Sequence, residues 1–401
     1  MANQATPDSD LLIAHIGDTH LRDTQYATSR RGLDFFEGFA HAVQIACRYA
    51  DIVVITGDIF DRPRPSPKVI GQLMQIDQIL QRAGKVALAI TGNHDWSDPT
   101  WLQTLFPGRS PREGGTGPCF LADDASGIIP IDDAELTFRG YKFAGLVPHS
   151  AGTFRASLAD ITVRVREADV VLFHGLVDGV VKFPIHFADP LHVREFPISR
   201  NNKAWLLGDV HLQGFVSVDR PGGGQCLVGY PGSTEMCSAA EPVEKAVPII
   251  RLTKDGASVE RTASFPIRPF IKAEVRDEEQ LEALMRRIEP VADQHPVVVV
   301  QFKRDLPQTI NRLHSMLDAQ RAVIRCYPLP ETKTYTEREV SDEDDQHLGM
   351  EHFVSRRFDG REDLQKFALD LLVRGESDAN NLIATLIETR LAATGIREDE
   401  E

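Results

Sequence analysis

The stretch Asp51 to Asp61, DIVVITGDIFD, decides the fold of this chain. Its apolar run from Ile52 to Ile55 is rich in β-branched residues and predicts a buried central strand of an α/β sheet. Gly57 then allows a sharp turn at the carboxyl end of that strand. Because open α/β sheets bind ligands beyond the carboxyl ends of their strands, we expect Asp58 to face the functional site. An Asp at this place is also a common turn or capping residue, so the stretch alone leaves that role open.

Four further apolar runs end in residues that commonly bind metal ions. The segments at these ends are Gly17-Asp18-Thr19-His20, Thr91-Gly92-Asn93-His94-Asp95, His174-Gly175 and Gly208-Asp209-Val210-His211. Side chains two residues apart on an extended segment lie on the same side, so each Asp-x-His pair can hold one ion. The repetition at five strand ends favours a metal centre over a set of unrelated turns.

The groups at these strand ends suit divalent metals. They are Asp18, His20, Asp58, Asn93, His94, His174, Asp209 and His211. Oxygen and imidazole ligands without thiolates suit Mn²⁺, Fe²⁺, Mg²⁺ or Zn²⁺, and the set exceeds what one ion needs. Two ions about 3.5–4 Å apart, bridged by one carboxylate, fit the cleavage of phosphate esters by hydroxide attack.

The composition is that of a globular protein with an excess of acid. The 401 residues are 42% apolar, and the formal charge is −15. Because nucleic-acid binders usually carry a basic surplus, any nucleic acid must be held locally, through metals or with a partner's help. No apolar run approaches the roughly 20 residues that span a bilayer, and we expect no membrane association and a cytoplasmic location. The five cysteines form no CxxC pair and are expected to be reduced, mostly structural thiols.

The sequence pattern changes along the chain and predicts four parts. Residues 1–265 form the first α/β domain, and residues 266–330 form a small α/β unit with strands and helices of its own. Residues 331–345 end in Ser341-Asp342-Glu343-Asp344-Asp345 and are typical of an acidic linker. Residues 346–401 contain two amphipathic helices broken at Gly375. This helical hairpin either packs on its own chain or docks on a partner.

The five strand-end motifs, in this order, resemble those of the calcineurin-like metallophosphoesterases. The resemblance implies an α/β fold in which a two-sheet sandwich is flanked by helices. It implies one metal held by Asp18, His20, Asp58 and His211, and a second held by Asp58, Asn93, His174 and Asp209. In that family the residue at His94 stabilises or protonates the leaving group. An acid placed as Asp61 is often pairs with that histidine, and a turn or capping role is the alternative for Asp61.

One position departs from the family pattern. The family usually has Gly-His-x-His in its last motif, and Asp209 stands where the first His belongs. A carboxylate still binds metal and adds negative charge, so we expect this second position to favour Mn²⁺ or Mg²⁺ over softer ions. The exchange also bears on whether the second metal is bound.

Two stretches narrow the resemblance to the SbcD-type nucleases of double-strand-break repair. They run from Gly57 to Ser66 and from Tyr230 to Glu235. The resemblance implies a Mn²⁺-dependent DNA exonuclease and endonuclease subunit whose second domain caps the site and positions DNA. It also implies a C-terminal segment that docks on an SbcC-like ABC-type ATPase with a coiled coil, and a homodimer.

Three residues near the motifs are candidate phosphate contacts. Arg62 and Arg64 follow Asp58, and solvated turn residues are the alternative reading for both. Ser233 lies in a turn rich in hydroxyl and backbone donors, which is equally a plain loop. Two rival functions also stay open: a phosphodiesterase or phosphatase for a small molecule or protein, and a non-catalytic scaffold for the ATPase.

Overall fold

A computed structural model describes residues 9–26, 28–107, 109, 125–147, 165–182, 191–302, 315 and 323–328. The chain divides into two compact units, Met1–Leu329 and Pro330–Glu401. The predicted acidic linker and C-terminal helical hairpin therefore lie outside the described residues. Within the described residues, no helix is both long and apolar enough to cross a membrane.

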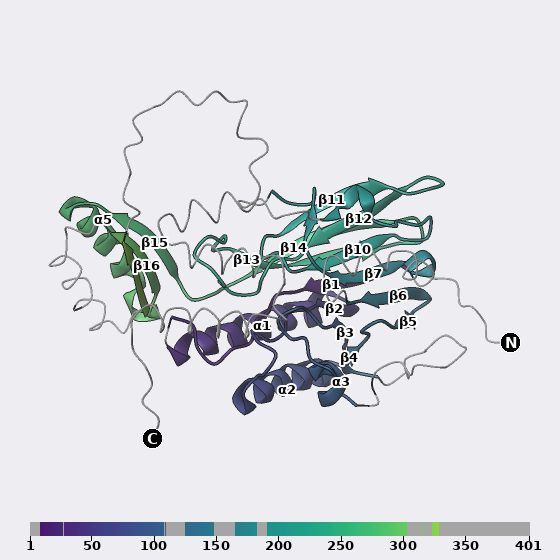
Figure 1. The fold of residues 1–401 in the computed structure, drawn as a ribbon, viewed down its shortest axis with the longest axis horizontal. Coiled ribbons are helices and arrows are strands. Elements are labelled where there is room, and N and C mark those ends of the chain that lie inside the picture. Colours follow the sequence, from purple (N-terminus) through teal and green to yellow (C-terminus); the bar gives the residue numbers. More distant parts are fainter. Residues whose placement is uncertain are drawn as a thin grey trace, which may run out of the picture. The chain divides into compact units, whose positions relative to one another are not determined.

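The predicted central strand lies in the middle of a six-stranded sheet (Figure 1). The strand order is β14 (Ala257–Phe265), β13 (Lys245–Leu252), β1 (Leu11–Ile16), β2 (Ile52–Thr56), β3 (Val86–Ile90) and β4 (Gly127–Pro130). Strands β1 to β4 are parallel, whereas β13 is antiparallel to β1 and forms a hairpin with β14. The carboxyl ends of β1, β2 and β3 therefore lie along one edge.

A second six-stranded sheet packs on the first and completes the expected sandwich. Its order is β11 (Gly214–Asp219), β12 (Gln225–Tyr230), β10 (Ala204–Gly208), β7 (Val170–His174), β6 (Tyr141–Leu146) and β5 (Glu135–Phe138). Alternate residues of β2 divide between two cores, as the two-residue period of a strand requires. Ile52 and Val54 face the second sheet, while Val53 and Ile55 face the helices.

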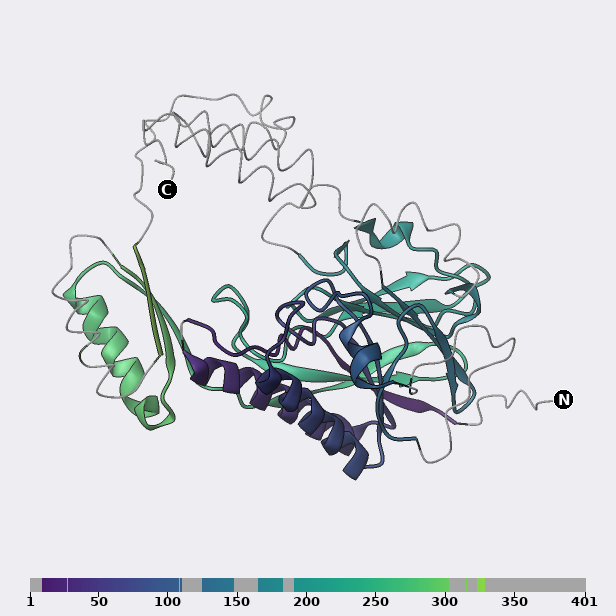
Figure 2. The same cartoon turned by 60° about the horizontal axis from the view of Figure 1, so that its bottom comes forward.

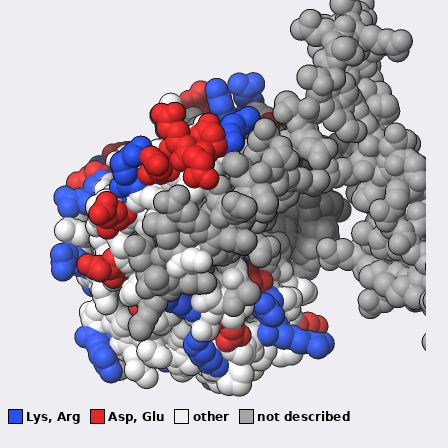
Figure 3. Space-filling model, turned by 90° about the vertical axis from the view of Figure 1, so that its left-hand side faces the viewer, with Lys and Arg blue, Asp and Glu red and all other residues white. Residues whose placement is uncertain are grey.

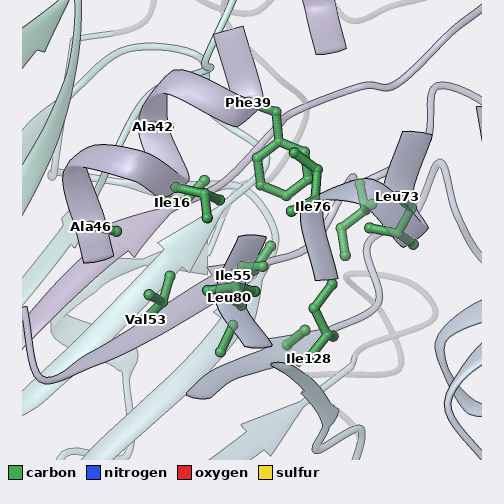
Figure 4. Packing of buried hydrophobic residues seen from close by; sticks show 14 of the residues in the cluster. Ile16, Phe39, Ala42, Ala46, Val53, Ile55, Leu73, Ile76, Leu80 and Ile128 are labelled. Carbon is green, nitrogen blue, oxygen red and sulfur yellow. The ribbon is translucent and has the colours of Figure 1, made fainter. Parts of the chain in front are cut away.

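Two helices cover the outer face of the first sheet (Figure 4). Helix α1 (Ser29–Tyr49) begins after Thr28, whose side chain accepts from the Arg30 backbone N–H. Helix α2 (Pro67–Arg82) begins after the capping Ser66, with proline at its first turn. The packed side chains are Phe39, Ala42 and Ala46 of α1, Leu73, Ile76 and Leu80 of α2, and Ile16, Val53, Ile55 and Ile128 of the sheet. A shorter helix, α3, spans Trp101–Leu105.

Small elements cover part of the other face of the second sheet. They are the paired strands β8 (Val177–Asp178) and β9 (Leu191–His192) and the 3₁₀ turn η1 (Val193–Glu195). Phe196 stacks on Trp205 of β10, with ring centroids 4.5 Å apart. Among the described residues, this apolar layer consists of these small elements.

A separate three-stranded parallel sheet follows the sandwich in the chain (Figure 2). It consists of β15 (Phe270–Val275), β16 (Val297–Phe302) and β17 (Val323–Pro328), with α5 (Glu278–Ile288) packed on one face and the turn η2 (Glu289–Gln294) after it. Leu281, Leu284 and Ile288 of α5 face this sheet. The elements match the predicted small α/β unit, while the boundary at residue 265 stays a prediction. The sequence also predicts a helix from Leu306 to Asp318, which lies outside the described residues apart from residue 315.

Candidate metal centre

Five strands from the two sheets bring the predicted ligands together. Asp18 and His20 follow β1, Asp58 follows β2, and Asn93 and His94 follow β3. His174 is the last residue of β7, and Asp209 and His211 follow β10. His174 Nδ1 lies 2.7 Å from the Thr56 carbonyl oxygen at the end of β2, which joins the two sheets at this edge.

The backbone at these strand ends adopts strained conformations. Asp18, His20, Asp58 and Asp209 have φ values of 51°, 44°, 51° and 96°. Such left-handed residues cost free energy and cluster at functional sites. Gly57 also has a positive φ, and a Cβ atom there would collide with the ring of His174. A glycine is therefore required for the strand end to approach this imidazole.

One side of the centre is built around two histidines. His20 Nε2 lies 3.0 Å from His211 Nε2 and 3.6 Å from Asp58 Oδ2. With metal–nitrogen bonds of about 2.1 Å, two ligands at right angles around one ion lie about 3 Å apart. The spacing of the two imidazoles therefore fits shared coordination of a single ion.

The other side is built around His174. Its Nε2 atom lies 2.8 Å from Asn93 Oδ1, 3.4 Å from Asp58 Oδ1 and 3.8 Å from Asp209 Oδ1. Because Nδ1 donates to the Thr56 carbonyl, the neutral ring carries a lone pair on Nε2. That lone pair faces three oxygens, so a proton or a metal ion must lie between the nitrogen and these oxygens.

The charges of the buried groups call for a cation as well. Burial acts to lower the pKa of His174, but the charge of Asp58 outweighs it and raises that pKa to about 10. Burial raises the pKa of Asp18 to about 7. Burial acts in the same direction on Asp58, yet His174 and His20 hold the pKa of Asp58 well below its usual range.

Asp18 supplies a further sign of a missing positive partner. Its Oδ1 atom accepts from the Asp209 backbone N–H at 2.9 Å, while Oδ2 is buried with no hydrogen-bond partner among the described residues. Three groups of donor atoms lie within 4.8 Å of one another here: Asp18, Asp58 and His174; His20, Asp58 and His94; and His20, His211 and Cys237. The oxygen and imidazole donors fit divalent metal ions, and Asp58 belongs to groups on both sides.

His94 lies at the open side of this cluster. Its side chain is 46% exposed, and Nε2 lies 4.0 Å from Asp58 Oδ2. Nδ1 lies 3.0 Å from the backbone oxygen of Asp61. Because a carbonyl only accepts, Nδ1 carries the proton, and Nε2 is the nitrogen that lies toward Asp58.

His94 contacts the residue expected as its partner, Asp61, but through the backbone oxygen instead of the side chain. The backbone carbonyl of Asp61 orients the imidazole, whereas the carboxylate of Asp61 pairs with Arg22 Nη2 at 2.6 Å. That carboxylate also lies 3.9 Å from His20 Nδ1. The predicted carboxylate–imidazole pairing is corrected accordingly, because Arg22 binds the Asp61 side chain.

The remaining predicted contacts divide into two outcomes. Arg62 and Arg64 are exposed. Burial raises the pKa of the Asp61 carboxyl, and the nearby charge of Arg62 acts in the opposite direction without outweighing burial. The expected role of Ser233 is corrected: its side chain is buried and lies 2.8 Å from both Glu241 Oε2 and Lys245 Nζ. A hydroxyl engaged inside the protein does not reach a phosphate.

Glu241 is a site residue that sequence reasoning missed. Its Oε1 atom lies 2.9 Å from His211 Nδ1, and its Oε2 atom accepts from Lys245 Nζ at 2.8 Å. Carboxylates that hold the second nitrogen of a metal-binding histidine fix its tautomer and orientation. No sequence motif surrounds Glu241, so its role depends on the turn that follows β12.

Comparison with known proteins agrees with this geometry. A family model described as calcineurin-like phosphoesterase matches residues 11–213. A protein of Methanosarcina acetivorans named DNA double-strand break repair protein Mre11 is 27% identical over 285 residues, which cover 68% of this chain and 42% of that protein. Proteins of the same name match in Haloferax volcanii (29% identity; 73% of this chain, 61% of that protein) and in Archaeoglobus fulgidus (25% identity; 96% and 86%). The chain thus spans about two fifths of the Methanosarcina relative and three fifths of the Haloferax relative.

Proposed function

The chain belongs to the calcineurin-like phosphoesterase family, and from that premise we propose that it is a metal-dependent nuclease that cleaves phosphodiester bonds of DNA. The observation that carries this proposal is the convergence of carboxylates, imidazoles and one amide at five strand ends, with His94 beside them. The relatives named as DNA double-strand break repair proteins support DNA as the substrate.

Each predicted ligand has a place in the proposal. Asp18, His20, Asp58 and His211 hold one divalent ion, and Asp58, Asn93, His174 and Asp209 hold the other. Mn²⁺ is the proposed metal, with Mg²⁺ as the alternative, because oxygen ligands predominate at the Asp209 side. Bound ions of this kind polarise phosphate oxygens and lower the pKa of the attacking water.

The chain's own residues supply the remaining steps. The Asp61 carbonyl fixes the ring of His94, so that a protonated Nε2 can donate to the leaving alkoxide. Glu241 holds His211 in the orientation that binds metal. Arg62 and Arg64, exposed after β2, are proposed to contact the DNA phosphates.

The proposed partner is an SbcC-like ABC-type ATPase that contributes DNA-binding surface. The formal charge of −15 supports this division of labour. On the face in Figure 3, Lys and Arg side chains lie scattered among Asp and Glu rather than in one continuous basic area. The capping role of residues 266–330, docking through residues 346–401, dimerisation and a cytoplasmic location remain predictions.

The proposal is tested by Mn²⁺-dependent cleavage of linear duplex DNA with the purified full chain. Bis(para-nitrophenyl) phosphate is assayed beside it, with Asp58→Asn, His94→Ala and, as a matched control, Asp219→Asn on the exposed end of β11. We expect the native chain and Asp219→Asn to cleave DNA, and the other two variants to lose cleavage. Hydrolysis of the small diester alone, also after addition of the ATPase, would replace the proposal with a small-molecule phosphodiesterase.

A further inference from the structure

A thiol lies beside the histidine pair of the metal centre. The donor atoms of Cys237, His20 and His211 all lie within 4.8 Å of one another, and the two imidazoles are 3.0 Å apart. Cys237 is a free, half-buried cysteine that follows the turn after β12. The sequence motifs predict oxygen and imidazole ligands without thiolates, and Cys237 lies outside all five of them.

The same carboxylate fixes both His211 and Cys237. Glu241 Oε1 lies 2.9 Å from His211 Nδ1 and accepts from the Ser238 backbone N–H at 2.8 Å. Glu241 Oε2 accepts from the Cys237 backbone N–H at 3.3 Å. The imidazole and the thiol-bearing residue are therefore held in place relative to each other by one buried group.

The contacts of Cys237 Sγ leave it available to a metal. The sulfur lies 3.7 Å from the Glu235 backbone oxygen, which is a weak hydrogen bond that a metal–sulfur bond can replace. The Cys237 main chain donates from its nitrogen to Glu241 Oε2 and accepts at its carbonyl oxygen from Gln25 Nε2, and both contacts persist when the sulfur changes its partner.

One thiolate with two imidazoles is a donor set that zinc-like ions prefer. Soft sulfur ligands select Zn²⁺ and related ions, so a thiolate added to the two imidazoles and to the carboxylates of Asp18 and Asp58 raises the preference of this position for such ions. The opposite side of the centre presents the oxygens of Asn93, Asp58 and Asp209 to His174, which suits harder ions.

We propose that Cys237 is a thiolate ligand at the His20–His211 side, so that this position, besides holding Mn²⁺, binds thiophilic divalent ions such as Zn²⁺ more tightly than the Asp209 side does. The inference rests on the proposed function only in taking these histidines as metal ligands. When the metal–sulfur bond forms, the Cys237 thiol gives its proton to the solvent, so binding releases a proton and changes no oxidation state. The two metal positions then differ in chemistry: one is soft and one is hard.

The first test uses Co²⁺ as a spectroscopic probe on the metal-free full chain. We expect the ultraviolet sulfur-to-cobalt charge-transfer band of a thiolate complex, together with the visible bands of protein-bound Co²⁺. Cys237→Ser should abolish the ultraviolet band, and Cys47→Ser, which changes a half-buried cysteine of α1, should keep it. Visible bands without the ultraviolet band, or an ultraviolet band that survives Cys237→Ser, would overturn the proposal.

A second test needs no variant of Cys237. Alkylation of native chain by iodoacetamide is followed at each cysteine by mass spectrometry, with and without Zn²⁺. We expect Zn²⁺ to slow alkylation of Cys237 about tenfold or more, since at a Zn²⁺ concentration of about ten times the dissociation constant only about a tenth of the chains keep a free thiol. Cys47 is the internal control, and equal slowing at both cysteines, or none at Cys237, would contradict the proposal.

These readouts separate the inference from the proposed nuclease activity. Mn²⁺-dependent DNA cleavage by native chain without a cobalt–thiolate band would remove the inference and keep the nuclease. A band and zinc protection at Cys237 in a chain that cleaves no DNA would support the thiolate ligand and remove the nuclease.

Discussion

His211 Nδ1 lies 2.9 Å from Glu241 Oε1, although the two residues are 30 positions apart in the chain. The pair connects the last metal motif to a buried network in which Glu241 also binds Ser233 and Lys245. An imidazole that donates through Nδ1 presents Nε2 to the metal. The turn after β12 therefore determines how His211 faces the centre.

Replacing Glu241 should weaken metal binding more than it changes the conformation of the strand-end segments. We expect Glu241→Gln to lower Mn²⁺ affinity by about 10–100-fold, because the amide holds His211 less firmly and carries no charge. Isothermal titration calorimetry on the metal-free chain measures this affinity. Glu244→Gln, three residues away and exposed, is the matched control and should bind like native chain.

Asp209 should determine the occupancy of the second metal position. Asp209→Asn keeps the size of the side chain and removes its charge 3.8 Å from His174 Nε2. We expect the number of Mn²⁺ ions retained after gel filtration to fall from two per chain toward one, as measured by elemental analysis. Asp219→Asn should retain both, and unchanged occupancy in Asp209→Asn would argue that this carboxylate is no ligand.

His94 should act on the chemical step rather than on metal binding. Because its Nε2 lies beside the centre, 4.0 Å from Asp58 Oδ2, His94→Gln is expected to lower the rate of DNA cleavage by about 10²–10⁴-fold. Mn²⁺ affinity should change little, since the predicted ligands remain. Loss of Mn²⁺ binding in this variant would instead make His94 a ligand.

A buried histidine away from the predicted ligands should make stability depend on pH. Burial lowers the pKa of His15 on β1 to about 3 from its ordinary 6.5, so the folded chain excludes a proton that the unfolded chain takes up. His15 therefore leaves the free energy of unfolding unchanged above pH 6.5 and lowers it progressively as the pH falls from 6.5 toward 3.

Removing that titration should flatten the pH profile. His15→Gln cannot take up a proton, so over this window its free energy of unfolding should fall less steeply, by up to about 1.4 kcal/mol per pH unit. Urea denaturation of the metal-free chains at several pH values measures both slopes. Parallel profiles for the two chains would contradict the assignment.

The ion pair between α1 and the segment before β15 should contribute strongly to stability. Arg268 Nε donates to Asp34 Oδ1 and Oδ2 at 2.8 Å, and the side chain of Asp34 is 1% exposed. Arg268→Ala leaves this buried carboxylate with Arg31, 2.8 Å away, as its remaining cationic partner, so we expect a loss in urea denaturation below the roughly 3–5 kcal/mol that an unpaired buried charge costs. Arg251→Ala removes exposed ion pairs with Glu260 and Asp10 and should change the free energy of unfolding far less.

Much of the sandwich was predictable because its signals are local. The β-branched run Ile52 to Ile55 and the bounds of β1 and α2 follow from short-range patterns that tertiary contacts did not override. The second sheet was less visible. Strands β11 and β12 form a hairpin around the glycine-rich turn that contains Gly222 and Gly224, and their pairing depends on register rather than on composition.

The sequence by itself determined which residues gather at the strand ends. Asp18, Asp58 and His174 each follow or end an apolar strand, and parallel strands place their carboxyl ends along one edge. Asp18 and Asp58 therefore meet once the first sheet forms, whereas His174 on β7 also requires that the second sheet pack on the first.

Only the tertiary structure decided which atoms the centre uses and what surrounds them. It gave His94 the carbonyl of Asp61 instead of the carboxylate, engaged Ser233 inside the protein, and brought Glu241 and Cys237 to His211. These contacts depend on the path of turns between distant strands. A turn's path is set by packing over the whole domain, so a residue pattern alone does not encode it.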